Sequence, residues 1–159
     1  MHVELVKEFR FESAHRLPRV PAEHKCFRMH GHSFRVEVAV AGEVDPELGW
    51  LVDFGEIAAR VEPVLRQELD HRVLNDVPGL ENPTSEVLAA WLWNRLGALV
   101  PHLAAITVQD LHRALHLPRP LTAAACLASQ VPWTRPRPKV VRNLTVLAEY
   151  VRHPERCTE

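Results

Sequence analysis

The sequence has few of the features that mark secreted or membrane proteins. Its 159 residues include three cysteines, at positions 26, 126 and 157. Such wide spacing makes a poor disulfide framework and favours a reducing compartment. The longest apolar runs, such as residues 87–93, are far shorter than the roughly 20 residues that cross a bilayer. The first eight residues include acids, where a secretory signal has an apolar core. We therefore expect a cytoplasmic protein that does not cross a membrane.

A large charge of one sign is also absent. The chain has 19 Lys and Arg against 20 Asp and Glu, a formal net charge of −1, so we expect no nucleic-acid-binding surface. The charge is nevertheless unevenly distributed. Residues 1–110 have 11 basic against 17 acidic residues, a net of −6, whereas residues 111–159 have 8 against 3, a net of +5. We therefore expect one globular domain over 1–110 and a different kind of segment over 111–159.

Hydrophobic patterns over residues 1–110 predict an α+β fold. Alternation over 3–11 and 33–40 predicts two strands that pair as an antiparallel hairpin, and 104–108 predicts a further strand. Asp53 and Glu56 form a capping-box-like helix start. The apolar residues that we expect on the buried face of this helix are Ile57, Val61, Val64, Leu65 and Leu69, with a bend at Pro63. The buried face expected for a second helix, which opens at 82–86, consists of Val87, Leu88, Trp91, Leu92, Leu96 and Leu99.

The pattern weakens after Leu111. Short helices are predicted over 121–127 and 139–151, and the Pro-rich stretch 131–138 is typical of an extended linker.

The densest group of chemically active residues is Cys26-Phe-Arg-Met-His30-Gly31-His32. Residues two apart in a strand point to the same side, so His30 and His32 can face one ion. Gly31 has no side chain to obstruct that ion or its substrate, and His15, after the first strand, approaches the same point if the strands pair. Three imidazoles with no fourth protein ligand describe a catalytic zinc site. The alternative is three unrelated histidines.

The spacing leaves three roles open for Cys26. As a fourth ligand it would close the metal site and make it structural. As a free thiol near a cation and Lys25 or Arg28 it could act as a base or nucleophile. It could also be an inert, half-buried thiol.

Three acidic positions and one further histidine complete the candidate set. Asp70 beside His71 is an arrangement suited to general-acid chemistry, although a histidine near a helix C-terminus also interacts favourably with the helix dipole. Glu86 lies in a helix first turn, where acids are common. Asp110 ends the third predicted strand.

Five motifs occur in an order that resembles the 6-pyruvoyl-tetrahydropterin synthase superfamily, and most closely its bacterial 6-carboxytetrahydropterin synthase branch. They are Phe-Arg-Phe-Glu-Ser-Ala-His-Arg-Leu at 9–17, Cys-x-x-x-His-Gly-His-Ser-Phe at 26–34, Gly-Trp-Leu-Val-Asp-Phe at 49–54, Leu-Asp-His-x-x-Leu-Asn-Asp at 69–76, and Asn-Pro-Thr-Ser-Glu at 82–86. The Cys-x-x-x-His-Gly-His spacing favours the carboxy-pterin branch. The resemblance covers residues 3 to about 110.

This resemblance implies an antiparallel sheet with two helices packed on one face (the T-fold), assembled as a homo-hexamer. It implies zinc bound by His15, His30 and His32, Cys26 as the proton-abstracting base, and Asp70 with His71 as the acid partner. The implied substrate is 7,8-dihydroneopterin triphosphate. It is converted to 6-carboxy-5,6,7,8-tetrahydropterin, with loss of acetaldehyde and triphosphate, in queuosine biosynthesis.

Thr84, Glu86 and Asp110 are the substrate-binding candidates. In the family a Glu anchors the pterin ring at the end of the third strand, and Asp110 stands near that position with a side chain one methylene shorter. The family continues with Thr-Cys-Thr-Ala and a last strand that ends in Tyr-Arg-Gly. Here the chain reads Asp-Leu-His-Arg-Ala-Leu-His-Leu-Pro-Arg over 110–119.

These ten residues can be encoded by GAC CTG CAC CGC GCG CTG CAT CTA CCG CGG. One base later, the same string encodes Thr-Cys-Thr-Ala-Arg-Cys-Ile-Tyr-Arg and the start of a Gly codon. Our hypothesis is that two nucleotides are missing near the Glu codon, so that 111–159 is a frame-shifted tail. We then expect the last family strand to be missing or replaced, and, if it is missing, an unpaired edge on the third strand.

Three alternatives follow. A pyruvoyl-type synthase would keep the side-chain carbons and release no acetaldehyde. An inactive remnant would bind zinc and form no pterin product. A structural zinc module would use Cys26 as fourth ligand.

Overall fold

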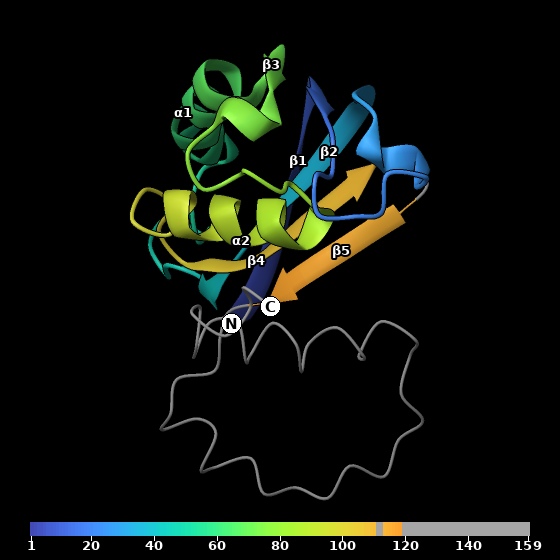
Figure 1. Ribbon diagram of the computed structural model, residues 1–159. Helices are drawn as coiled ribbons and strands as arrows, with labels where there is room; N and C mark the ends of the chain where they lie inside the picture. Colours follow the sequence, from blue (N-terminus) through green and yellow to red (C-terminus); the bar gives the residue numbers. More distant parts are fainter. Residues whose placement is uncertain (111–112, 119–159) are drawn as a thin grey trace, which may run out of the picture. The chain divides into compact units, whose positions relative to one another are not determined.

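Two long strands form the centre of the sheet in the computed structural model, which describes residues 1–110 and 113–118 (Figure 1). β1 (His2–His15) and β2 (His30–Glu43) pair antiparallel from His2 opposite Glu43 to His15 opposite His30. The predicted hairpin is confirmed, and its strands extend to the histidines themselves. The segments 121–127, 131–138 and 139–151 lie outside the described residues.

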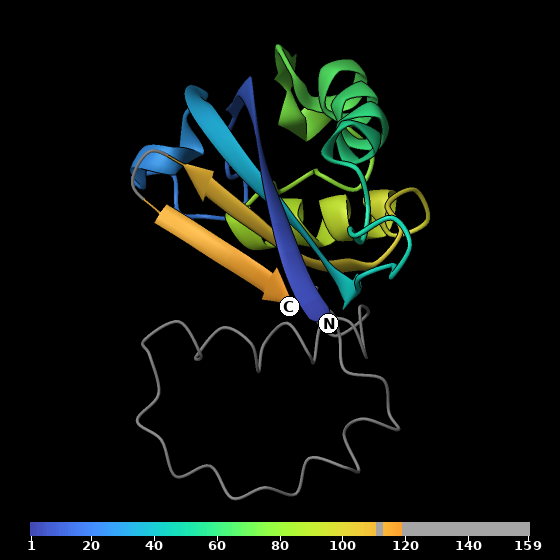
Figure 2. The same cartoon turned by 180° about the vertical axis from the view of Figure 1, so that it is seen from behind.

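Three shorter strands complete a five-stranded sheet of order β3-β1-β2-β4-β5. β4 (Leu103–Asp110) pairs antiparallel with β2, and β5 (Arg113–Pro118) pairs antiparallel with β4 at the sheet edge (Figures 1 and 2). β3 (Arg72–Val73) pairs with β1 in parallel, so the sheet is mixed. The compact unit extends from Met1 to Pro118.

The sheet buries one face. Odd-numbered residues of β1 and even-numbered residues of β2 point inward, while the alternate positions are mostly exposed. Lys7 interrupts the apolar pattern on the inner face, and its Nζ lies 5.9 Å from the Phe9 ring centroid and 5.8 Å from that of Phe54. A lysine can occupy this position because its stem packs on apolar surface while its ammonium group contacts aromatic faces.

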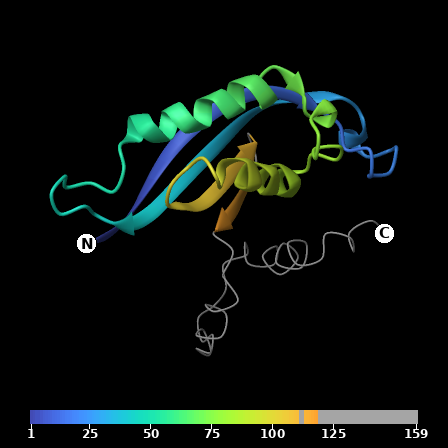
Figure 3. The same cartoon turned by 90° about the vertical axis from the view of Figure 1, so that its left-hand side faces the viewer.

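Two helices cover the inner face. α1 (Phe54–Val64) begins after Asp53, whose side chain accepts hydrogen bonds from the N–H groups of Gly55 and Glu56. It runs alongside β1 and β2 in Figure 3 and, after Pro63, passes into a π-helical turn (Leu65–Leu69). All five apolar residues predicted on its inner face are buried.

α2 (Ser85–Leu96) packs on β4 and β5. Its fully buried residues are Leu88, Ala89, Leu92 and Leu96. The prediction that Leu99 is buried was wrong: the helix ends at Leu96, and Leu99 is 37% exposed. Two 3-10 turns, Lys25–Phe27 and Leu74–Asp76, lie in the loops. Within residues 1–110 and 113–118, no helix is long and apolar enough to span a bilayer.

β5 corrects the expectation of an unpaired edge on the third predicted strand, which is β4. Residues 113–118 form a strand although their sequence departs from the family ending. The physical reason is local alternation: Leu115 and Leu117 are each 7% exposed, while His116 between them is exposed. A period of two is sufficient for a half-buried edge strand. Of the two outcomes expected for the last family strand, the structure has a replacement.

Candidate functional site

Three imidazoles meet at the end of the β1–β2 hairpin. His15 lies opposite His30 in the strand register, and His32 lies two residues further along β2, so all three point to the inner face. One ring nitrogen from each lies within 4.8 Å of the other two. The ring centroids are 4.7, 4.9 and 4.8 Å apart. The structure thus brings together the three residues predicted as metal ligands.

Backbone carbonyls orient two of these rings. The Nδ1 atom of His15 lies 2.9 Å from the carbonyl oxygen of Pro83, and Nδ1 of His30 lies 2.7 Å from that of Arg28. Because a carbonyl oxygen only accepts hydrogen bonds, both Nδ1 atoms carry a proton, and the nitrogen left to ligate a metal is Nε2 in each ring. Metal-binding histidines are commonly oriented in this way.

The His15 ring carries an unsatisfied buried atom. His15 is 7% exposed, and its Nε2 is buried without a hydrogen-bond partner. Burial lowers the pKa of His15 to about 4, with the nearby charge of Asp110 acting in the opposite direction. The ring is therefore neutral at pH 7, which is the form that ligates metals. A buried Nε2 lone pair beside two more imidazoles fits a metal cation such as zinc.

Aromatic side chains form the wall behind the three imidazoles. The Phe34 ring centroid lies 6.0 Å from that of His15 and 5.5 Å from that of His32, and Phe34 stacks on Phe11. The apolar wall accounts for the desolvation of His15. Between His30 and His32, a Cβ at Gly31 would meet the Ser13 carbonyl oxygen at 3.8 Å, an ordinary contact, so the protein itself leaves room for a side chain there.

Cys26 lies in the 3-10 turn Lys25–Phe27, half-buried. Its N–H donates to Nδ1 of His24 over 3.1 Å, and its carbonyl accepts from the N–H of Leu17 over 2.8 Å. Among the described residues, the group able to hold a metal consists of the three histidines and does not include Cys26. This favours an open, three-histidine site over a closed one.

Asp70 and His71 are attached to β1 through one residue. The N–H of Glu12 donates to Oδ1 of Asp70 over 2.9 Å, and the Glu12 carbonyl accepts from the N–H of His71 over 2.6 Å. The Glu12 hydrogen bond holds the pKa of Asp70 below its usual value, and His71 acts in the same direction. Nδ1 of His71 lies 3.0 Å from Oδ1 of Asp70, so the predicted carboxylate–imidazole pair is formed.

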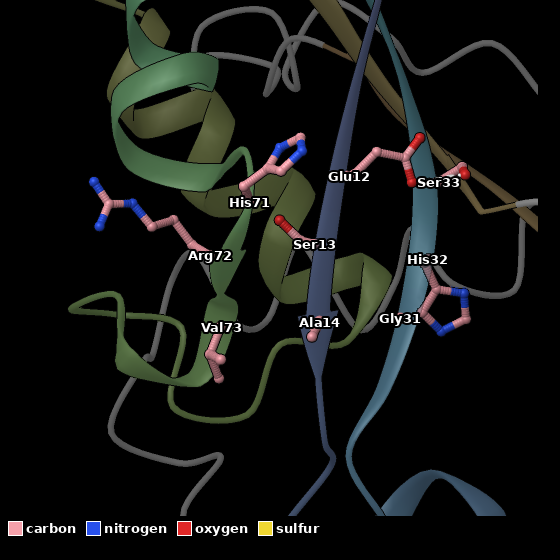
Figure 4. A pocket seen from close by; sticks show the side chains of 9 residues that line it. All are labelled: Glu12, Ser13, Ala14, Gly31, His32, Ser33, His71, Arg72 and Val73. Atoms are coloured by element: carbon pink, nitrogen blue, oxygen red, sulfur yellow. Dashed lines mark hydrogen bonds between the residues drawn. The ribbon is translucent and has the colours of Figure 1, made fainter.

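His71 and His32 line the same cavity, shown in Figure 4, whose volume is ≈ 540 Å³. Glu12, Ser13 and Gly31 also line it. In Figure 4 the imidazole of His71 extends toward β1, while Glu12 extends toward β2, where it accepts a hydrogen bond from Ser33 over 2.8 Å. The cavity therefore places His71 and one metal-ligand candidate, His32, on the walls of one hollow.

The three predicted substrate-binding residues lie at two nearby places. Thr84 caps α2, its hydroxyl accepting from the N–H of Val87 over 3.3 Å, directly after the Pro83 carbonyl that holds His15. Glu86 is exposed in the first turn of α2. Asp110 ends β4, half-buried and close enough to His15 to raise its pKa.

Sequence reasoning missed the two orienting carbonyls. The Pro83 carbonyl is 68 positions from its partner in the chain, and every residue type carries this group, so no residue pattern could have identified it. In the sequence, Arg28 stands out only as a neighbour of Cys26. Its backbone role follows from its place two residues before His30.

Known proteins resemble both the sequence and the fold. The profile of the family "6-pyruvoyl tetrahydropterin synthase" matches residues 4–115. The 6-carboxy-5,6,7,8-tetrahydropterin synthase of Synechocystis sp. is 46% identical over 111 residues, which are 67% of this chain and 84% of that protein. Human 6-pyruvoyl tetrahydrobiopterin synthase is 35% identical over 75 residues, 45% of this chain and 52% of that one. The structure of Caenorhabditis elegans 6-pyruvoyl tetrahydropterin synthase aligns with a TM-score of 0.68 at 27% identity, covering 74% of this chain and 96% of that chain.

Proposed function

Because this chain belongs to the 6-pyruvoyl tetrahydropterin synthase family, whose members are lyases, we propose that it is a zinc-dependent 6-carboxytetrahydropterin synthase. Its substrate would be 7,8-dihydroneopterin triphosphate, and its products 6-carboxy-5,6,7,8-tetrahydropterin, acetaldehyde and triphosphate, in queuosine biosynthesis. The identity to the Synechocystis enzyme supports this choice over the pyruvoyl type.

The observation that carries the proposal is the unsatisfied Nε2 of His15, buried within a cluster of three imidazoles. A buried polar atom without a partner costs about 1–3 kcal/mol, and a cation bound there removes that cost. His15, His30 and His32 would hold the zinc. Bound zinc supplies Lewis acidity, which makes the hydroxyl groups of the substrate side chain more acidic.

The chain's own groups would bind the pterin and move protons. The Cys26 thiol is the proposed base, on a backbone fixed on both sides by hydrogen bonds. His71 would donate a proton, with Asp70 stabilising its charged form. Thr84, Glu86 and Asp110 would bind the substrate. The proposed assembly is a homo-hexamer.

Turnover tests the proposal. The purified 159-residue chain is incubated with zinc and 7,8-dihydroneopterin triphosphate, and acetaldehyde and pterin products are measured. Acetaldehyde together with 6-carboxytetrahydropterin is the expected result. A pterin product that retains its side-chain carbons would instead indicate the pyruvoyl type. The variant Cys26→Ala should keep the zinc and lose turnover. Loss of zinc from that variant would contradict the role as base and support a structural site.

A second candidate, a zinc-binding remnant without turnover, is favoured by Asp110, which stands where the family has a Glu. We propose a frame-shifted origin for residues 111–159, and the gene sequence across codon 110 tests it. Codons that cannot encode the family ending would exclude that origin. If the codons can encode that ending, a chain with the frame restored by two nucleotides should turn over faster than the present chain, with equal zinc content.

A further inference from the structure

The loop between β1 and β2 is positively charged within an otherwise acidic part of the chain. Residues 16–29 contain four basic residues and one acidic residue, a net charge of +3, whereas residues 1–110 together have a net charge of −6. The basic residues are Arg16, Arg19, Lys25 and Arg28. The loop begins after His15 and ends before His30, so its two ends adjoin the imidazole cluster.

Two of these arginines line one cavity. Arg16 and Arg28 border a hollow of ≈ 570 Å³, separate from the cavity of Figure 4, together with Phe27, Asn75 and Asp76. The backbone of Arg16 is fixed by Asn75, whose amide oxygen accepts from the Arg16 N–H over 2.9 Å and whose amide nitrogen donates to the Arg16 carbonyl over 2.9 Å. The carbonyl of Arg28 is fixed by His30.

Arg16 and Arg28 differ in their ion pairing from most arginines of residues 1–110. Five arginines of residues 1–110 form ion pairs with glutamates: Arg10, Arg35, Arg60, Arg66 and Arg95. Within the described ranges, neither Arg16 nor Arg28 has such a partner. Two arginines that line one hollow, each without an ion-pair partner, suit an anion that accepts several hydrogen bonds, although the Asp76 carboxylate lines the same hollow.

We propose that this cavity is the subsite for the phosphate groups of the substrate. The inference rests on the proposed function, because it deepens the binding of a pterin triphosphate at the same site. In that compound a single methylene separates the hydroxyl-bearing carbons from the phosphate ester. Phosphate binding must therefore occur close to the metal ligands, and Arg16 is adjacent in sequence to His15, while Arg28 is two residues from His30.

Asp76 lines the same cavity and opposes the proposed ligand. Its carboxylate repels phosphate, so it should weaken binding by a modest factor. This gives the proposal a variant that acts in the opposite direction. Asp76→Asn should bind inorganic triphosphate about threefold more tightly, a gain that damage to the fold would not produce.

Calorimetry with the full chain and inorganic triphosphate is the direct test. Arg16→Gln and Arg28→Gln should each weaken binding about tenfold, as expected for one charge-assisted hydrogen-bonded pair. The control Arg66→Gln, in an exposed i,i+4 pair on α1 and the following turn, should leave the affinity unchanged. Equal affinities for the wild type and both cavity variants would overturn the proposal, as would the absence of wild-type binding.

Kinetics then separates the subsite from the reaction. In both cavity variants KM for 7,8-dihydroneopterin triphosphate should rise about tenfold, while KM for unphosphorylated 7,8-dihydroneopterin stays constant. An equal rise for both compounds would overturn the subsite. If the wild type converts neither compound but binds triphosphate in an arginine-dependent manner, the proposed function fails and the anion subsite stands.

Discussion

The β1–β2 hairpin and the β4–β5 hairpin contribute differently to the site. β1 and β2 pair over 14 residues and carry the three histidines. β5 has six residues, and its pairing with β4 ends at Asp110 opposite Arg113. The proposed metal ligands therefore lie on central strands, whereas the pterin-binding candidate Asp110 lies at the end of a strand that pairs with the sheet edge.

The difference between the hairpins separates two requirements of the proposed reaction, metal binding and pterin binding. The donors for the metal depend on β1, β2 and the carbonyls of Pro83 and Arg28, none of which belongs to β4 or β5. The proposed pterin binding depends on Asp110 at the end of β4. A change confined to the second hairpin should therefore affect turnover while zinc binding persists, and the following experiments test that separation.

The largest effect is expected for a ligand on the first hairpin. His32→Ala should weaken zinc binding on the order of a thousandfold, because a zinc site gains several kcal/mol from each donor. Metal analysis after dialysis measures it. His116→Ala, which removes an exposed histidine of β5 bonded to Thr107, is the matched control and should retain zinc. Zinc loss from both variants would show that the hairpins are coupled.

Core truncations compare the stability of the two hairpins. Phe34→Ala on β2 should lower the free energy of unfolding by about 3–5 kcal/mol, since Phe34 is 3% exposed and stacked on Phe11. Leu115→Ala on β5 should cost about 2 kcal/mol, at the low end for a buried leucine, because an edge strand relaxes more easily. Urea denaturation of the zinc-free chain measures both. A larger loss for Leu115→Ala would contradict the comparison.

A change of Asp110, at the end of β4, should alter turnover and leave zinc binding unchanged. Asp110→Glu restores the methylene that separates this residue from the family's glutamate, and we expect kcat/KM to rise about tenfold, because a misplacement of roughly 1 Å costs up to about a hundredfold. Zinc content should stay the same. An unchanged rate with normal zinc content would mean that Asp110 does not bind the pterin.

The smallest effect concerns the attachment of Asp70 to β1. The Glu12 hydrogen bond lowers the pKa of Asp70 in the folded chain. The charged carboxylate therefore stabilises the fold above its unfolded pKa of about 3.9, and this contribution is lost as the pH falls through the folded pKa. Asp70→Asn should cost about 1 kcal/mol at pH 7 and nothing below that pKa. Urea denaturation across pH 3–7 measures it, and a pH-independent difference would contradict the cause given.

The sequence predicted what depends on local periodicity and on side-chain type. The hairpin, both helix starts and the inner face of α1 follow from alternation, capping residues and 3.6-residue spacing. β3 was missed because a two-residue strand has no period of its own. β5 was expected only as a possible replacement for the last family strand, because the alternation at Leu115 and Leu117 is too short to identify a strand by itself. The convergence of the three histidines was predictable, since it needs only the hairpin register.

The orienting carbonyls of Pro83 and Arg28 affect what genetics can detect at this site. A substitution at either position changes the side chain and leaves the hydrogen-bond acceptor in place. Saturation mutagenesis should therefore identify the three histidines as intolerant, while Pro83 tolerates replacements that preserve the local backbone. Mutational robustness at that position would say nothing against its importance. Replacing the amide bond by an ester, which weakens the carbonyl as an acceptor without altering any side chain, would reveal the contribution.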